Sequence, residues 1–175
     1  MTPRGRSFGS PSDLVDALTA TPVLIRNLTK GATASVLHSR PSKDEWSANE
    51  VLAHLRACAD VWGGCIEALL TEDRPTIRGV SPTRWIEDTD YREQPFARSL
   101  RAFTRQRKKL TATLSELREA DWSRDGVVTG AGKPLTRTVR DYAEWLARHE
   151  RPHVKQISRT VDAMTDRSLS SVVPS

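Results

Sequence analysis

Apolar residues recur at intervals of three and four residues in four separate stretches of the chain. This spacing places the apolar side chains on one face of an α-helix, where they can be buried. The start of the second stretch is the clearest, because Ser47 and Glu50 form the S-x-x-E pattern of a capping box. Strand signals are scarce, so the pattern predicts an all-α protein built as one four-helix bundle. The predicted helices cover about 12–28, 48–70, 95–119 and 138–163.

The connections between these helices differ in length. Prolines, glycines and charges in 71–94 predict a long irregular segment, and 121–137 is expected to be a short hairpin or a loop. An extended chain spans about 3.3 Å per residue, so the first of these segments can cross back along the whole second helix. This long crossover permits the second and third helices to run parallel in an up-down-down-up bundle. An up-down-up-down bundle is the alternative.

The 175 residues predict a single domain with short flexible ends. No apolar run approaches the ~18 residues that span a bilayer, and the N-terminus lacks the apolar core of a secretory signal. Cys58 and Cys65 lie too far apart along one helix for a disulfide, which favours reduced thiols and a cytoplasmic protein without a membrane partner. The predicted parts are a flexible segment 1–11, the bundle 12–164 and a flexible tail 165–175.

The chain has a net charge of +5, and its strongest local cluster of basic residues lies within the third predicted helix. Basic residues at helical spacing spread around the helix, which favours a solvated surface over a nucleic-acid interface. No nucleic-acid-binding motif accompanies them, so no nucleic-acid partner is expected. The cluster consists of Arg101, Arg105, Arg107, Lys108 and Lys109.

Three of the four histidines occupy positions that face the bundle interior. His149 and His153 lie four residues apart on the seam of the fourth helix, and His54 lies at the edge of the second seam. In the up-down-down-up arrangement the three histidines lie at a similar position along the bundle axis. An up-down-up-down bundle would place His54 and the other two in opposite halves of the bundle. Three imidazoles suit zinc, nickel or iron and leave a position for water or substrate. Each could instead be a structural histidine; their convergence favours a metal site.

Residues 149–153, H-E-R-P-H, also match the short zincin motif, in which the glutamate is a general base. Pro152 is expected to distort the helix that presents both histidines. Glu150 lies about 100° around the helix from His149, so it need not face the metal. We therefore do not assign Glu150 as a base.

Four other residues are candidates for the pocket around the histidines. Cys58 could be a fourth ligand, although a buried thiol is the favoured interpretation. Trp145 could contact substrate but is expected in the core. Gln156 could support His153. Arg107 could bind an anionic substrate, although a side chain that reaches solvent is favoured.

Two segments resemble the DinB/YfiT-like family. Residues 46–55, W-S-A-N-E-V-L-A-H-L, resemble the opening of the family's second helix, and 145–149, W-L-A-R-H, together with His153, resemble its last helix. The resemblance extends over about 12–163. It implies an up-down-down-up bundle, often a homodimer, with a divalent metal held by the residues matching His54, His149 and His153.

The resemblance also implies a class of reaction, because characterised members of the family include thiol-dependent S-transferases and a mycothiol-dependent isomerase. We expect a metal-dependent transferase that acts on a small-molecule substrate with a low-molecular-weight thiol as cosubstrate. A divalent ion favours deprotonation of a thiol or of water at neutral pH. The alternatives are a hydrolase at the same site and a non-catalytic bundle that binds a ligand or partner.

Overall fold

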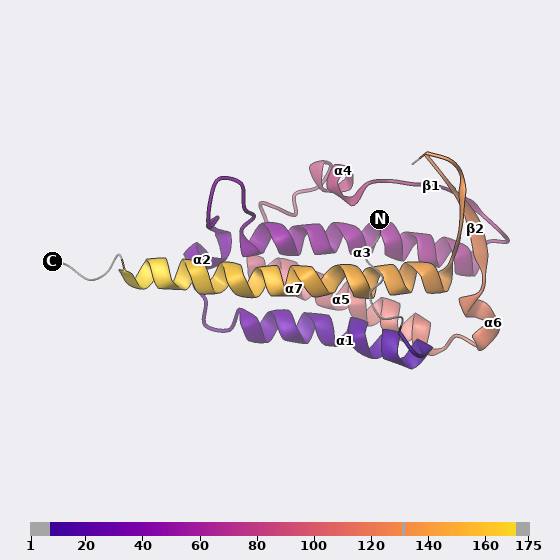
Figure 1. Ribbon diagram of the computed structural model, residues 1–175, viewed down its shortest axis with the longest axis horizontal. Helices are drawn as coiled ribbons and strands as arrows, with labels where there is room; N and C mark the ends of the chain where they lie inside the picture. The colour runs from indigo at the N-terminus through magenta and orange to yellow at the C-terminus, as the bar shows by residue number, and fades with distance from the viewer. Residues whose placement is uncertain (1–7, 131, 171–175) are drawn as a thin grey trace.

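The computed structural model describes residues 8–130 and 132–170. Within these residues, four long helices form the bundle, and three short helices and three short strands lie in their connections (Figure 1). The long helices are α1 (Pro11–Leu28), α3 (Ala48–Thr71), α5 (Phe96–Ser115) and α7 (Val139–Ser170). The short helices are α2 (Ala34–His38), α4 (Pro82–Glu87) and α6 (Glu119–Trp122). The strands are β1 (Thr76–Arg78), β2 (Asp125–Thr129) and β3 (Leu135–Thr138).

The four long helices have the predicted up-down-down-up order. In Figure 1, α3 and α5 both run from the end of the bundle near α2 toward the end near α6, and α1 and α7 run the opposite way. α3 packs against α5 and α7, and α1 packs against the same two helices. The crossover between α3 and α5 returns along the bundle with α4 against α3. The predicted fold class is therefore confirmed.

Helix boundaries follow local signals. The Ser47 hydroxyl accepts a hydrogen bond from the Glu50 amide at 3.2 Å, and the Glu50 carboxylate accepts one from the Ser47 amide at 2.9 Å, which confirms the capping box. α1 begins at Pro11, one residue before the predicted bundle. The parts of the predicted flexible ends that cover 1–7 and 171–175 lie outside the described residues.

The predicted end of the last helix near residue 163 is wrong, because α7 continues to Ser170. Tertiary contacts hold the added turns. Met164 packs against the buried residues at this end of the bundle. Arg167 donates a hydrogen bond to the Pro41 carbonyl at 2.6 Å, which joins the last turns to the segment after α2.

A three-stranded sheet closes the end of the bundle where α3 ends and α7 begins (Figure 1). β2 and β3 form an antiparallel hairpin, which was one of the two expectations for 121–137. β1 pairs parallel to β2, with Thr76 opposite Val127. The expectation of an irregular segment over 71–94 is wrong at β1 and α4, because pairing with a distant strand and packing against α3 supply the order.

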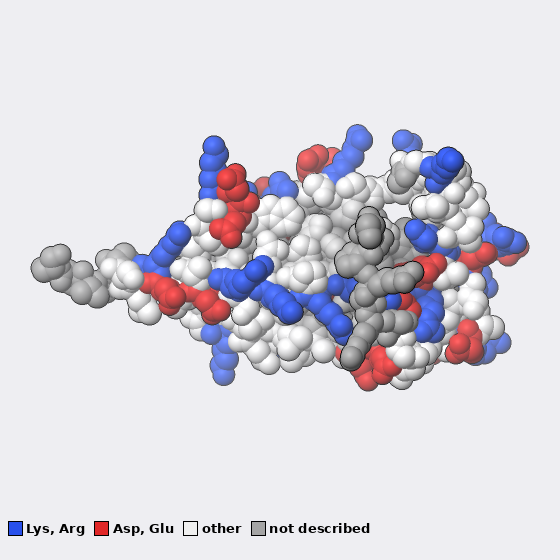
Figure 2. All heavy atoms as spheres, in the orientation of Figure 1, with Lys and Arg blue, Asp and Glu red and all other residues white. Residues whose placement is uncertain are grey.

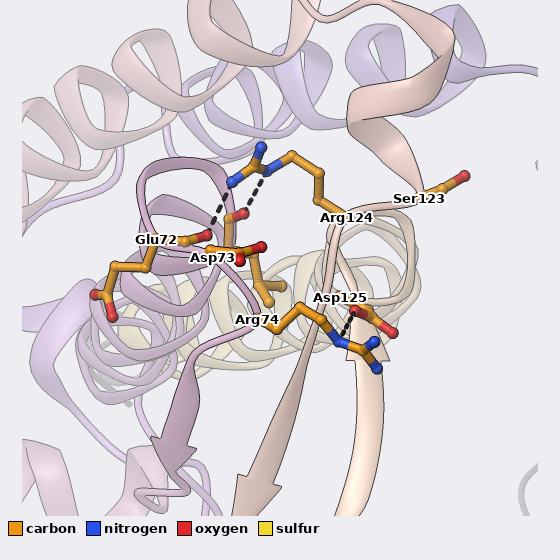
Figure 3. Close-up of a pocket in the computed structure, with 7 residues that line it drawn as sticks. Glu72, Asp73, Arg74, Ser123, Arg124 and Asp125 are labelled. Carbon is orange, nitrogen blue, oxygen red and sulfur yellow. Dashed lines mark hydrogen bonds and ion pairs between the residues drawn. The ribbon is translucent and has the colours of Figure 1, made fainter.

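Arg124 joins this sheet to the C-terminal end of α3. Its guanidinium donates hydrogen bonds to the carbonyls of Leu69 and Glu72 at 2.7 and 2.8 Å, and so satisfies carbonyls that a helix end leaves unpaired (Figure 3). Arg74 pairs with Asp125 at 3.3 Å across the same small cavity of about 130 Å³. Both arginines at this cavity therefore have partners, Arg124 in backbone carbonyls and Arg74 in Asp125, and these contacts serve the fold.

Buried apolar residues form two clusters along the bundle. The cluster nearer the sheet includes Leu18, Leu69 and Leu146, and the other cluster includes Leu52 and Ile157. On α1, α5 and α7 a buried polar side chain lies at a sequence position between the residues of the two clusters, and on α3 His54 lies one turn before Cys58 of the cluster nearer the sheet. We call this set the central polar layer; it comprises Thr21, His54, Arg107 and Glu150.

Charged side chains of both signs lie on the face that carries α7. Figure 2 shows a row of Lys and Arg along the middle of this face, with Asp and Glu toward its ends and edges. Of the predicted basic cluster, Arg101, Arg105 and Lys108 are exposed, whereas Arg107 is buried. Among the described residues, no helix is both long and apolar enough to cross a membrane.

We expect Gly126→Ala to destabilise the protein. A Cβ at this position would lie 2.6 Å from the Pro75 carbonyl oxygen and 2.9 Å from the Leu69 side chain, where strand β2 meets the end of α3. Overpacking of this kind costs about 1–3 kcal/mol. Urea unfolding measures the effect, with Gly64→Ala as control, because a Cβ there meets no atom within 4 Å. Equal stability of Gly126→Ala and the parent protein would contradict the close packing.

Candidate metal centre

His54, His149 and His153 lie together between α3 and α7. The Nε2 atoms of His54 and His149 are 3.3 Å apart, and those of His149 and His153 are also 3.3 Å apart. One ring nitrogen from each residue lies within 4.8 Å of the other two. The structure therefore brings together the three histidines that the sequence placed on facing helices.

The antiparallel packing of α3 and α7 makes this meeting possible. His54 lies in the second turn of α3, and His149 and His153 lie one turn apart on the same face of α7. Pro152 lies inside α7, but the helix remains continuous through it. The expected distortion therefore does not separate the two histidines of this helix.

Burial keeps these imidazoles neutral at neutral pH. Loss of solvation, with smaller contributions from His153 and Arg92, lowers the pKa of His54 to about 4. Burial also lowers the pKa of His149 to about 4, with the neighbouring histidines as the next cause. The pKa of His153 is lowered by burial as well. Neutral imidazoles offer the lone pairs that a metal ion requires.

The nitrogen spacing fits a tetrahedral metal site. Zinc–imidazole bonds of about 2.0–2.1 Å place two ligand nitrogens of a tetrahedron about 3.3–3.4 Å apart. The two shortest Nε2–Nε2 distances match this value. Neutral imidazoles at this distance would otherwise direct lone pairs at one another, because His149 Nε2 has at most one proton to share between two neighbours. The residues present thus fit a divalent cation.

Gln156 and Cys58 adjoin the histidines. His153 Nδ1 lies 2.9 Å from the Gln156 side-chain oxygen, so Nδ1 carries the donated proton and Nε2 keeps its lone pair. Cys58 Sγ lies 3.5 Å from His54 Nε2. The Cys58 side chain is buried, and burial raises the pKa of its thiol to about 12. In the absence of a cation the thiol is therefore neutral.

Aromatic rings form the side of the site that leads to the surface. The Trp62 ring meets the His149 ring edge to face at 4.9 Å and stacks on Trp145 at 4.6 Å. The expectation that Trp145 belongs to the core is wrong, because 47% of this residue is exposed. Trp46 lies on the other side, 5.3 Å from the His54 ring. The exposed Trp145 ring therefore stacks on Trp62, which in turn contacts His149.

Arg107 occupies neither of its expected places. It is 1% exposed and forms an ion pair with Glu150, which is buried to the same degree. The expectation that Arg107 reaches solvent is thus wrong, and it does not face an anionic substrate. Glu150 points toward α5, as its position beside His149 on the helix allows. Burial raises the pKa of Glu150, while the Arg107 charge opposes this shift.

Sequence reasoning missed the structural role of Glu150. The sequence did contain a sign of this role, since Arg107 and Glu150 are oppositely charged residues at positions that the bundle buries. The partnership itself depends on how α5 and α7 are rotated about their axes. One α7 segment therefore sends His149 toward α3 and Glu150 toward α5.

Comparisons with known proteins agree with this fold. A model of the DinB superfamily matches residues 17–157. The structure is similar to that of YfiT from Bacillus subtilis, with a TM-score of 0.77 and 19% identity over 94% of this chain and 93% of that chain. YfiT is described as "a probable metal-dependent hydrolase with an unusual four-helix bundle topology". No curated protein matches the sequence.

The metal-free protein is expected to lose stability as the pH falls from about 6.5 toward 4. In that window the histidines of the unfolded chain bind protons, whereas His54 and His149, with pKa values near 4, do not. The loss is on the order of 1 kcal/mol per histidine after allowance for partial exposure. Urea unfolding at pH 7 and pH 5 with a chelator measures it. A double variant His54→Gln/His149→Gln should depend less on pH, and His38→Gln should behave like the parent. Equal pH dependence in all three proteins would contradict the expected shift.

Glu150→Gln is expected to destabilise the fold by about 3–5 kcal/mol, because it leaves the Arg107 guanidinium buried without a countercharge. Replacing both partners, in Arg107→Met/Glu150→Leu, should cost far less or stabilise the protein. Chemical unfolding separates the two outcomes. The exposed pair Lys109–Glu67 supplies the control, since Glu67→Gln should cost less than about 1 kcal/mol. A Glu150→Gln effect as small as that of Glu67→Gln would refute the buried pair.

Proposed function

The chain belongs to the DinB superfamily, and on that basis we propose that it is a metal-dependent enzyme whose divalent ion is held by His54, His149 and His153. The observation that carries the proposal is the pair of 3.3 Å distances between Nε2 atoms, which matches a tetrahedral site. Zinc, nickel and iron all accept imidazole nitrogen. Three protein ligands leave one position for a reactant, as in catalytic rather than structural zinc sites.

Residues around the histidines would each have a defined task. The Gln156 oxygen holds the Nδ1 proton of His153 and so directs its Nε2 toward the other two histidines. The rings of Trp62 and Trp145 shield one side of the site from water, and the exposed face of Trp145 offers a surface on which a substrate can stack. Cys58 is near enough to His54 to be a fourth ligand, although its burial favours a neutral thiol.

We propose that the reaction is a transfer that uses a low-molecular-weight thiol. A divalent ion, when bound, lowers the pKa of a thiol or of water and polarises an electrophile. In the transfer the thiol loses its proton to solvent, its sulfur bonds to an electrophilic carbon of the second substrate, and the leaving group departs from that carbon. Support for this reaction comes from the resemblance to thiol-dependent members of the family. A homodimeric state and a cytoplasmic location remain predictions.

Hydrolysis at the same site is the second candidate. It is favoured by the description of YfiT, whose fold this chain shares. The same residues would then hold and orient a water molecule in place of the thiol, and the proton would pass to solvent in the same way. The two reactions differ in whether a thiol is consumed, which makes them separable in one assay.

The first test measures metal content in tag-free protein. The parent is expected to hold about one equivalent of a divalent metal, and His54→Ala, His149→Ala and His153→Ala less than about a tenth of that. His38→Ala is the matched control, because His38 is exposed at the end of helix α2 and lies outside the cluster, so its replacement should not change the metal content. A parent protein that stays metal-free after addition of zinc, nickel and iron would refute the site.

Activity is then measured with each loaded protein. Chlorodinitrobenzene with several small thiols reports transfer, and nitrophenyl esters without thiol report hydrolysis. We expect the parent and His38→Ala to catalyse thiol transfer, and we expect the three histidine-cluster variants to lose this activity. Hydrolysis without thiol consumption would favour the second candidate. A metal-loaded protein inactive in every pairing would point to a non-catalytic binding bundle.

A further inference from the structure

A cavity of about 510 Å³ lies on the side of α3 that faces α5 and the crossover segment. A volume of this size is typical of sites that hold small organic molecules. Its lining comes from α3, α4, α5 and the segment after α4. The lining includes Asp60, Gly63, Gly64, Trp85, Gln106 and Leu110.

The cavity is separate from the histidine cluster. Gly63 follows His54 by nine residues, which places the two about 180° apart around the helix axis and about 13 Å apart along it. Gly63 lines the cavity, and none of the three histidines does. The body of α3 therefore stands between the cavity and the candidate metal centre.

Two adjacent glycines in the middle of α3 form part of the cavity wall. Glycine in a helix interior is less favourable than any other residue except proline. Nothing inside the protein requires it here, because a Cβ added at Gly63 or Gly64 would meet no atom within 4 Å. The glycines thus weaken the helix while they leave its backbone open to the cavity, which points to an occupant that approaches closely.

Asp60 holds the other walls in place. Its carboxylate accepts hydrogen bonds from the Trp85 indole at 3.2 Å and from the Tyr91 hydroxyl at 2.7 Å. It also accepts a hydrogen bond from the Gln106 amide on α5. The Arg56 guanidinium lies 3.7 Å over the Tyr91 ring. One carboxylate on α3 therefore fixes side chains from the crossover and from α5, so the cavity is built before any ligand arrives.

The two carboxylates that border the cavity already have partners. The Asp60 carboxylate accepts hydrogen bonds from three uncharged donors, and Glu67 forms an ion pair with Lys109 at 3.6 Å at the rim. Much of the remaining lining is apolar, including Leu110 and the ring of Trp85, which is 40% exposed. Such a lining favours a ligand without net charge.

We propose that this cavity binds an uncharged, planar, largely apolar small molecule that lies against the Gly63–Gly64 backbone and the Trp85 ring. The site is distinct from the metal centre and does not depend on the metal-dependent reaction proposed above. It would give the protein a second small-molecule function, either as an additional substrate pocket or as a site that senses such a compound.

The test uses phenylnaphthylamine, a neutral planar dye whose fluorescence rises in apolar sites. Titration of the parent protein is expected to give saturable binding, with amide NMR shifts centred on Gly63 and Gly64. Gly64→Leu should weaken binding by at least about tenfold, because the added side chain fills the cavity. Ala20→Leu is the matched control, since it adds a leucine to an exposed position on α1, which does not line the cavity.

Two further variants keep the test independent of folding and of the metal. Trp85→Ala removes one wall and should weaken binding, while the metal content should equal that of the parent. Gly63→Ala should raise the melting temperature of the ligand-free protein, because alanine favours the helix and fits the open space. Melting curves and circular dichroism check that each variant is folded.

Four results would overturn the proposal. One is the absence of saturable dye binding to the folded parent. Another is binding that Gly64→Leu and Trp85→Ala leave unchanged, or amide shifts centred on His54. The last is a Gly64→Leu protein whose mass in solution is half that of the parent, with no dye binding to either, which would show that the cavity wall is a subunit interface.

Discussion

The buried ion pair between Arg107 and Glu150 constrains the whole bundle. Two charges removed from water are tolerated only when each has the other in close contact, so α5 and α7 cannot rotate or slide independently. Because His149 precedes Glu150 directly, the orientation that sends the carboxylate toward α5 also sends the imidazole toward α3. The ion pair and the histidine cluster therefore both follow from the rotation of α7 about its axis. Both lie in the central polar layer, where they interrupt the apolar interior.

The crossover between α3 and α5 is the second constraint. It makes α3 antiparallel to α7, which brings His54 level with His149, and β1 anchors its start by pairing with β2. Its return path lays α4 against α3, where Asp60 binds Trp85 and so builds the wall of the second cavity. One long connection thus produces both the meeting of the histidines and the hollow on the opposite side of α3.

The sequence predicted what each helix determines by itself. Seam spacing located the four helices, the Ser47 capping box located the start of α3, and histidines at interior positions predicted the three-histidine cluster once the topology was considered. What depends on two elements at once was not predictable. Glu150, the partner of Arg107, lies 43 residues away on α7. The apolar pattern of α7 does not fix how this helix is rotated relative to α5. Likewise, Trp145 is exposed because the bundle buries Trp62 beneath it.

Helix α3 contributes to both the histidine cluster and the cavity. Tertiary contacts, rather than its own helix propensity, stabilise it. A central Gly63–Gly64 pair would weaken an isolated helix, but most helical stability in proteins comes from packing, and α3 packs against α4, α5 and α7. The capping box secures its start, and the Arg124 guanidinium satisfies carbonyls at its end. A helix supported at both ends and on several sides can give up side chains on one face. α3 can therefore present the His54 imidazole toward α7 and bare backbone toward the cavity without losing its shape.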